Sequence, residues 1–118
     1  MKPILCLDFD GVCHSYTSGW KGAAVIPDPP VPGMEEFLVA AINYFDVAIY
    51  SSRSGQEGGI QAMKDWFDQY TITDIRTMLN FPTEKPPAMV GIDDRVLTFN
   101  GIWPNLNELV NFKPWNLK

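Results

Sequence analysis

Two short apolar segments of this chain each end in a pair of acidic residues. The first covers residues 4–7 and continues as Asp8-Phe9-Asp10, and the second covers residues 88–92 and continues as Asp93-Asp94. Short, continuously apolar segments are typical of strands that are covered on both faces in a parallel sheet. If both strands belong to one parallel sheet, the four carboxylates meet at one edge, where repulsion would raise their pKa values unless a cation bridges them. The pattern therefore predicts a magnesium site at this edge.

Periodic apolar residues elsewhere predict helices that alternate with strands. Apolar side chains at i, i+3, i+4 spacing predict amphipathic helices over residues 34–45 and 60–70, and a further helix around residues 104–110. Strands are predicted at residues 47–50 and, with a less regular pattern that suggests a sheet edge, at residues 75–79. Strands that alternate with helices indicate a parallel α/β sandwich.

Length and composition favour one soluble domain. With 118 residues, 46% of them hydrophobic, the chain can form one core but not two ordinary ones, so residues 1–118 are interpreted as a single domain. A membrane-spanning helix needs about 18 or more consecutive apolar residues, and no apolar stretch of this sequence is that long. We therefore expect no membrane partner. Cys6 and Cys13 form neither a CxxC motif nor a disulfide framework, which favours a reducing, cytoplasmic location.

The spacing of the first acidic pair suits a two-step reaction. Asp8 and Asp10 are two residues apart, so their side chains point the same way while the backbone stays extended. Gly11 then permits a sharp change of direction. In this arrangement one carboxylate can attack a substrate while its neighbour moves a proton. The alternative interpretation is a pair of aspartates that serve only a turn.

Four motifs in a fixed order resemble those of the haloacid dehalogenase (HAD) superfamily. They are Asp8-Phe9-Asp10-Gly11, Ser51 after the strand at 47–50, Lys85, and Asp93-Asp94. Phosphatases of that superfamily carry an Asp-x-Asp-Gly motif, a Ser or Thr, a Lys and a late acidic pair in this order. The resemblance spans nearly the whole chain. It implies a three-layer α/β sandwich around a parallel, Rossmann-like sheet, and a phosphorylated substrate.

The resemblance also implies roles for the acidic residues. Asp8 would be the nucleophile that takes the phosphoryl group, and Asp10 the general acid that protonates the leaving oxygen and later activates water. Mg²⁺ would be held by the Asp8 carboxylate, the Asp10 backbone carbonyl and Asp93. Asp94 would bind Mg²⁺ directly or through water. Oxygen-only ligands favour magnesium over zinc.

The remaining motif residues would bind the phosphate. Ser51 would donate a hydrogen bond to the phosphoryl oxygens, with Ser52 as its rival because a one-residue shift exchanges which hydroxyl faces the site. Gly11 is expected beside the phosphate. Lys85 would neutralise charge in the transition state; its alternative is a solvated loop lysine. Arg53, in a Ser-x-Arg sequence, would bind a phosphate bidentately, or would instead pair with Asp94 or a helix acid.

The chain has no room for a cap domain. Residues 11–50 are taken up by a loop and the first helix, and residues 53–84 by one helix, one strand and their turns. An open site excludes water poorly, so either the substrate is large enough to cover it or a second subunit of a homo-oligomer does. Trp20 and Lys21 lie in the first loop and could contact such a substrate.

These features predict a capless, magnesium-dependent phosphomonoester hydrolase. The first alternative is a phosphatase for nucleotides or for the 3′ or 5′ ends of nucleic acids, which Arg53 favours and the net charge of −5 disfavours. The second is a phosphate- or partner-binding module without turnover. Intact Asp8 and Asp10 oppose that alternative, because a binding module needs no nucleophile.

Overall fold

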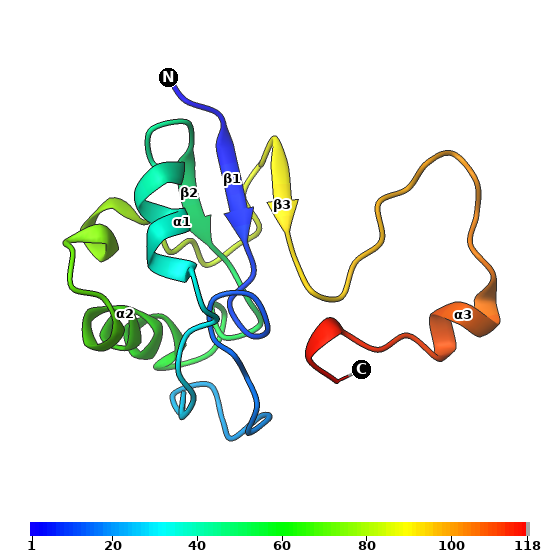
Figure 1. Ribbon diagram of the computed structural model, residues 1–118, viewed down its shortest axis with the longest axis horizontal. Coiled ribbons are helices and arrows are strands. Elements are labelled where there is room, and N and C mark those ends of the chain that lie inside the picture. Colours follow the sequence, from blue (N-terminus) through cyan, green and yellow to red (C-terminus); the bar gives the residue numbers. More distant parts are fainter. Residues whose placement is uncertain (118) are drawn as a thin grey trace.

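A computed structural model describes residues 1–117 of the chain. It contains three strands, three α-helices and two short 3₁₀ helices (Figure 1). In chain order they are β1 (Ile4–Leu7), α1 (Met34–Ala41), β2 (Asp46–Ile49), α2 (Gly59–Tyr70), η1 (Ile75–Met78), β3 (Val90–Ile92), α3 (Leu106–Val110) and η2 (Trp115–Leu117). None of the described helices has the length and apolar character needed to cross a membrane.

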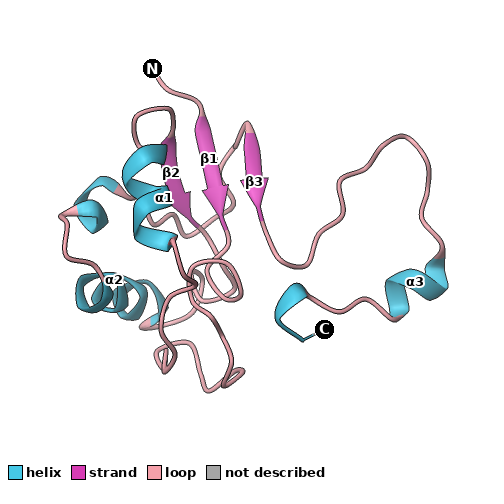
Figure 2. Cartoon of the chain, in the orientation of Figure 1, coloured by secondary structure: helices cyan, strands magenta, loops and turns pink. Residues whose placement is uncertain are grey.

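The three strands form one parallel sheet in the order β2-β1-β3, with helices beside it (Figure 2). In the register, Leu5 of β1 lies opposite both Val47 and Val90. The ladder between β1 and β3 continues one residue further, because the backbone N–H of Asp8 donates to the carbonyl of Ile92 at 2.9 Å. The predicted parallel α/β sheet is therefore confirmed, and the two acidic segments leave the sheet side by side.

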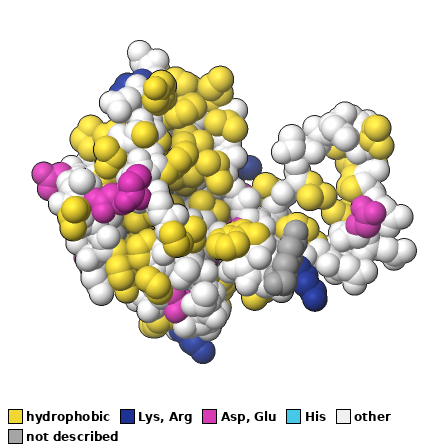
Figure 3. Space-filling model, in the orientation of Figure 1, with side chains coloured by type: hydrophobic (Ala, Val, Ile, Leu, Met, Phe, Trp, Pro, Cys, Tyr) yellow, Lys and Arg dark blue, Asp and Glu magenta, His cyan; other side chains and the backbone are white. Residues whose placement is uncertain are grey.

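The segment from Arg95 to Lys113, here named the C-terminal arm, extends away from the body of the molecule (Figure 1). It carries α3, which lies within the predicted helix at 104–110 and has no buried residue. Hydrophobic side chains gather along the arm as well as on the viewed face of the body (Figure 3). After the arm, the chain returns to the body at Trp115, whose indole N–H donates to the Gly11 carbonyl at 2.7 Å.

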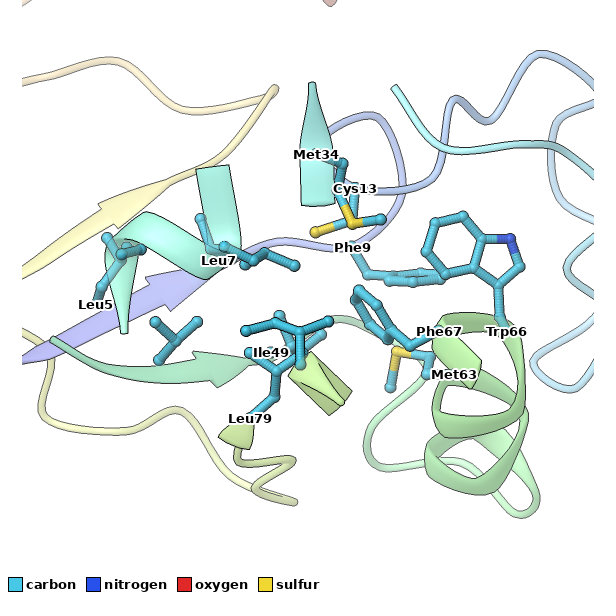
Figure 4. Close-up of a cluster of buried hydrophobic side chains, with 14 residues drawn as sticks. Leu5, Leu7, Phe9, Cys13, Met34, Ile49, Met63, Trp66, Phe67 and Leu79 are labelled. Atoms are coloured by element: carbon cyan, nitrogen blue, oxygen red, sulfur yellow. The ribbon is translucent and has the colours of Figure 1, made fainter. Parts of the chain in front are cut away.

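The core lies between the sheet and the first two helices (Figure 4). Alternate residues of β1, Leu5 and Leu7, are buried, and the fully buried ring of Phe9 continues this face beyond the strand. Phe9 meets Phe67 of α2 edge to face, with 5.7 Å between ring centroids. Leu38 of α1 is also fully buried. This packing fixes the end of β1, where Asp8 and Asp10 flank Phe9.

The strand predicted at residues 75–79 is wrong, because Ile75–Met78 forms the 3₁₀ helix η1. Polar side chains favour this turn over an extended chain. The Thr77 hydroxyl donates to the Asp74 carbonyl at 2.7 Å, and Arg76 forms an ion pair with Asp68 of α2 at 3.0 Å. Only the next segment contacts the sheet edge, through a single bridge between Ala48 and Asn80.

Candidate functional site

Three aspartates meet at the carboxyl ends of β1 and β3. One carboxylate oxygen each from Asp8, Asp93 and Asp94 lies within 4.8 Å of the others. Gly11 makes room for this approach, since a Cβ there would overlap the Asp94 carboxylate. Its φ of 82° also lies in the left-handed region that other residues rarely adopt. The four-residue acidic group expected from the sequence is thus a cluster of three, with the Asp10 side chain outside it.

The electrostatics of the cluster centre on Asp8. Burial raises the pKa of the Asp8 carboxyl to about 8, helped by a hydrogen bond with Asp94 and by the charge of Asp93. The backbone N–H of Phe9, which donates to Asp8 Oδ1 at 2.9 Å, opposes this rise. An added cation would favour the charged carboxylates and reverse the shift. The oxygen-only ligand set fits a hard ion such as Mg²⁺.

The Asp10 carboxylate is held by two side chains on the opposite side. Nδ1 of His14 lies 2.9 Å from Asp10 Oδ1. Nε2 of His14 accepts the backbone N–H of Asp28 at 3.1 Å, so Nδ1 is the nitrogen that donates to Asp10. Arg53 donates to both Asp10 oxygens, with Nε 3.0 Å from Oδ2 and Nη2 3.1 Å from Oδ1. We call His14 and Arg53 the Asp10 clamp.

The clamp sets the protonation state of Asp10. Partial burial would by itself raise the pKa of this carboxyl, but the hydrogen bonds from His14 and Arg53 together lower it below its ordinary range. Asp8 and Asp10 are two residues apart, yet their pKa values move in opposite directions. Such divergence is typical of paired carboxylates with different roles.

Arg53 is fully buried and bonded to the body. Its Nη1 donates to the carbonyls of Gly22, Ala23 and Val25 at 2.9, 2.8 and 3.2 Å. The ring of Trp20 lies over the guanidinium at 4.7 Å. Its carboxylate partner is therefore Asp10, rather than the Asp94 or helix acid considered from the sequence, and the arginine ties the first loop to the end of β2.

The structure separates the two candidate serines. Ser51 is buried, and its hydroxyl accepts the backbone N–H of Arg53 at 3.0 Å. Ser52 is exposed and lines a hollow of about 140 Å³ beside the carboxylates. The other residues that line this hollow are Asp8, Asp10, Tyr16, Trp20, Asp94 and Arg95. The hydroxyl available to a ligand in this arrangement is that of Ser52.

Lys85 lies on the other side of the cluster. It is exposed and lines a hollow of about 640 Å³ together with Asp8 and Asp93. Its ammonium forms no ion pair with a carboxylate in the part of the chain that the structure describes.

Several residues of the site were not expected from the sequence. His14 belongs to none of the four motifs, although its spacing of four residues from Asp10 was a usable signal in a tight loop. Tyr16 has a φ of 60°, unusual for a residue other than glycine, and lines the hollow beside Asp8. Trp115 contacts Gly11, which is 104 residues away in the sequence, and no local sequence pattern predicts that contact.

Comparisons of the chain with protein-family models, with curated proteins and with solved structures found no match. The residues and geometry of the site therefore carry the functional inference.

Proposed function

We propose that this protein is a magnesium-dependent phosphomonoester hydrolase that works through an aspartyl-phosphate intermediate, with the capless three-layer architecture of the HAD superfamily. The observation that supports it is the divergence of Asp8 and Asp10. Asp8 joins a carboxylate cluster suited to a cation, whereas Asp10 is held apart by His14 and Arg53. Two adjacent carboxylates in different environments are what a nucleophile and a proton carrier require.

In the first step, an Asp8 carboxylate oxygen forms a bond to phosphorus as the bond between phosphorus and the ester oxygen breaks. The leaving oxygen takes a proton from Asp10 or from water. Because the clamp favours ionised Asp10, donation by Asp10 is most effective at low pH. Substrates whose leaving group is already acidic, such as aryl phosphates, need this proton least.

In the second step, water attacks the phosphorus of the aspartyl phosphate. Asp10 accepts a proton from that water, the bond between phosphorus and Asp8 breaks, and inorganic phosphate leaves. The ionised state of Asp10 suits this base role directly. Ser52 and Lys85 would position and neutralise the phosphoryl oxygens.

Asp8, Asp93 and Asp94 would hold Mg²⁺. When bound, the ion would supply electrostatic stabilisation of the phosphoryl oxygens and neutralise the repulsion within the cluster. The predicted backbone carbonyl ligand from Asp10 remains part of this proposal.

Phosphate release from an aryl phosphate tests the proposal. Activity is expected with Mg²⁺ and not with excess chelator, and Asp8→Asn is expected to abolish turnover while circular dichroism stays unchanged. Asp46→Asn is the matched control, because Asp46 is exposed at the start of β2. Turnover that survives in Asp8→Asn would refute the nucleophile assignment.

Phosphate esters of nucleosides or nucleic-acid ends are a second candidate substrate class. The observation that favours them is the pair of aromatic residues, Tyr16 and Trp20, in the hollow with Asp8 and Asp10. The Trp20 side chain is 45% exposed and could stack on a base. A phosphate-release screen over nucleotides, 3′- and 5′-phosphorylated oligonucleotides, sugar phosphates and phosphopeptides distinguishes the classes.

A further inference from the structure

The C-terminal arm carries a concentration of exposed apolar side chains. Nine large ones lie between residues 96 and 112, with exposed fractions from 36% to 84%. They are Val96, Leu97, Phe99, Ile102, Trp103, Leu106, Leu109, Val110 and Phe112. Contiguous apolar surface of this extent on a soluble protein marks an interaction site.

The residues of the arm also surround a concave space. Leu97, Phe99, Trp103, Leu106 and Leu109 are among the residues that line a concave space of about 1050 Å³, all of whose lining residues belong to the arm. Protein interiors leave few voids larger than a water molecule. An apolar hollow of this size has the dimensions of a receptor for several side chains of a partner.

The composition of the arm matches an interface core. Between Arg95 and Lys113 the only other charged residue is Glu108, whereas aromatic residues recur at 99, 103 and 112. Interface cores are depleted in charge and enriched in aromatic residues. Because the arm is nearly neutral, a contact through this segment brings few like charges of the two copies together.

The arm is fixed at both ends. It starts directly after the carboxylates that follow β3, and it ends at an anchor in η2. There Trp115 donates to the Gly11 carbonyl at 2.7 Å and Asn116 donates to the Ser15 carbonyl at 3.2 Å. Pro114, just before the anchor, is buried. The arm is therefore a projecting loop and not a free tail.

The body carries a complementary apolar surface at β3. This strand is the edge of the sheet, and Val90 and Ile92 are 48% and 40% exposed. The parallel register turns them to the same face as Leu5 and Leu7. Ile92 and Phe37 of α1, which is 47% exposed, lie beside each other on this face. A hollow of about 200 Å³ lies here, lined in part by Phe37 and Ile92. We call Phe37, Val90 and Ile92 the open edge.

We propose that the arm is the dimerisation element of this protein, and that it packs on the open edge of a second copy of the chain. A two-fold axis would form the contact twice, since each copy supplies one arm and one open edge. At roughly 150–250 Å² for each aromatic side chain and somewhat less for aliphatic ones, the nine arm residues expose on the order of 1,000 Å². A standard interface buries about 800 Å² on each partner, so the arm reaches this size when most of its exposed apolar surface is covered, and the open edge adds to it.

Sedimentation velocity and light scattering of the full chain test the proposal. The wild-type protein is expected to be a dimer at micromolar concentration. Trp103→Ser/Leu106→Ser in the arm and Phe37→Ser at the open edge are each expected to raise the dimer Kd by about 30-fold or more, the effect of truncating an interface anchor. Ile72→Ser is the matched control, because Ile72 is 99% exposed on the body, and it is expected to leave the Kd unchanged.

A mixing experiment distinguishes this arrangement from other dimers. The arm variant keeps an intact open edge and the edge variant keeps an intact arm, so the mixture restores one of the two contacts. Heterodimers, detected by energy transfer between labelled variants, are expected to form more tightly than either variant's homodimer. Circular dichroism confirms that each variant is folded.

Three outcomes would overturn the proposal. One is a wild-type protein that stays monomeric at 100-fold higher concentration, which would mean that the arm folds on its own chain or stays open. Another is a dimer whose Kd is the same in the arm variant. The third is a mixture of folded variants that forms no heterodimer. Each is independent of phosphatase activity.

Discussion

Asp8 and Asp10 are two residues apart, yet the pKa of one carboxyl is raised and that of the other is lowered. Burial, together with the two further carboxylates that Asp8 faces, raises its pKa to about 8. Asp10 faces His14 and Arg53, which lower its pKa. The alternation of side chains along an extended chain predicts only that the two carboxylates point the same way. The difference arises from partners that come from other segments.

The raised pKa of Asp8 makes the stability of the metal-free protein depend on pH. Between about pH 4 and pH 8 the unfolded chain has ionised Asp8 while the folded chain keeps it protonated, so stability is expected to fall as the pH rises through this window. Asp8→Asn is expected to flatten this slope and, in chelator at pH 8, to be more stable than wild type by about 2–4 kcal/mol. Urea unfolding from pH 5 to pH 8 measures this, with Asp46→Asn as the control.

Magnesium is expected to reverse that dependence. An ion bound by ionised Asp8, Asp93 and Asp94 stabilises the folded state by RT ln(1 + c/Kd), where c is the concentration of free Mg²⁺. The rise in Tm on adding Mg²⁺ should therefore be larger at pH 8 than at pH 6, and should vanish in Asp8→Asn. A rise in Tm of equal size in that variant would place the ion elsewhere.

Substitution of His14 tests how the Asp10 clamp sets the pKa of Asp10. Removing its donor in His14→Ala is expected to raise the pKa of Asp10, because one of the two groups that favour the ionised form is lost. Asp10 acts as a base only after the leaving group has departed, so its ionisation is reported by kcat and not by kcat/KM. With an aryl phosphate for which hydrolysis of the aspartyl phosphate limits turnover, the acid limb of the kcat profile should then move to higher pH by up to about one unit. His14→Asn, which keeps a donor near the position of Nδ1, should move it less. An unmoved limb in a folded His14→Ala protein would contradict the base role of Asp10.

At the scale of elements, the first residue of helix α2 packs against the backbone of Arg53. A Cβ at Gly59, the first residue of α2, would lie 1.9 Å from the Arg53 carbonyl oxygen. Gly59→Ala is therefore expected to destabilise the protein by about 2 kcal/mol or more, because backbone must shift. Gly55→Ala is the control, since a Cβ there meets nothing within 4 Å. Thermal unfolding compares them, and equal Tm values would show that the turn yields easily.

The elements differ in how far their sequences determine them. The strands at β1 and β2 and the helix at α2 were predicted because their apolar patterns match the faces that they bury. The same pattern failed at residues 75–79, where turn-forming contacts of Thr77 and Arg76 outweigh a weak alternation. The meeting of Asp8 with Asp93 followed from the rule that parallel strand ends share an edge. The Arg53–Asp10 ion pair did not, because it depends on the path of the first loop.

At the scale of the whole molecule, the C-terminal segment returns to the loop that follows Asp10. Trp115 and Asn116 hold carbonyls in the loop that follows Asp10, across 104 and 101 residues. The arm between β3 and this anchor is the part of the chain that contributes least to the body's core. The C-terminal segment thus holds the loop that follows Asp8 and Asp10.

The anchor predicts a long-range effect of a mild substitution. Trp115→Phe removes the indole donor to Gly11 and keeps most of the ring, so the expected loss of stability is about 1 kcal/mol, the net contribution of one hydrogen bond. Because Gly11 directly follows Asp10, a loosened loop should lower kcat several-fold, since small displacements of reacting groups are costly. Hydrogen exchange of the amides from Gly11 to Ser15 should quicken in step with that loss.

Trp103→Phe is the matched control for the anchor. Trp103 is 84% exposed on the arm and makes no hydrogen bond to the body among the described residues, so the same exchange of tryptophan for phenylalanine should leave kcat and loop exchange unchanged. A parallel loss of kcat in both variants would mean that the arm as a whole, and not the bond to Gly11, governs the site. A loss confined to Trp115→Phe, with the dimer Kd unchanged, would separate the anchor from the dimerisation surface that the same arm carries.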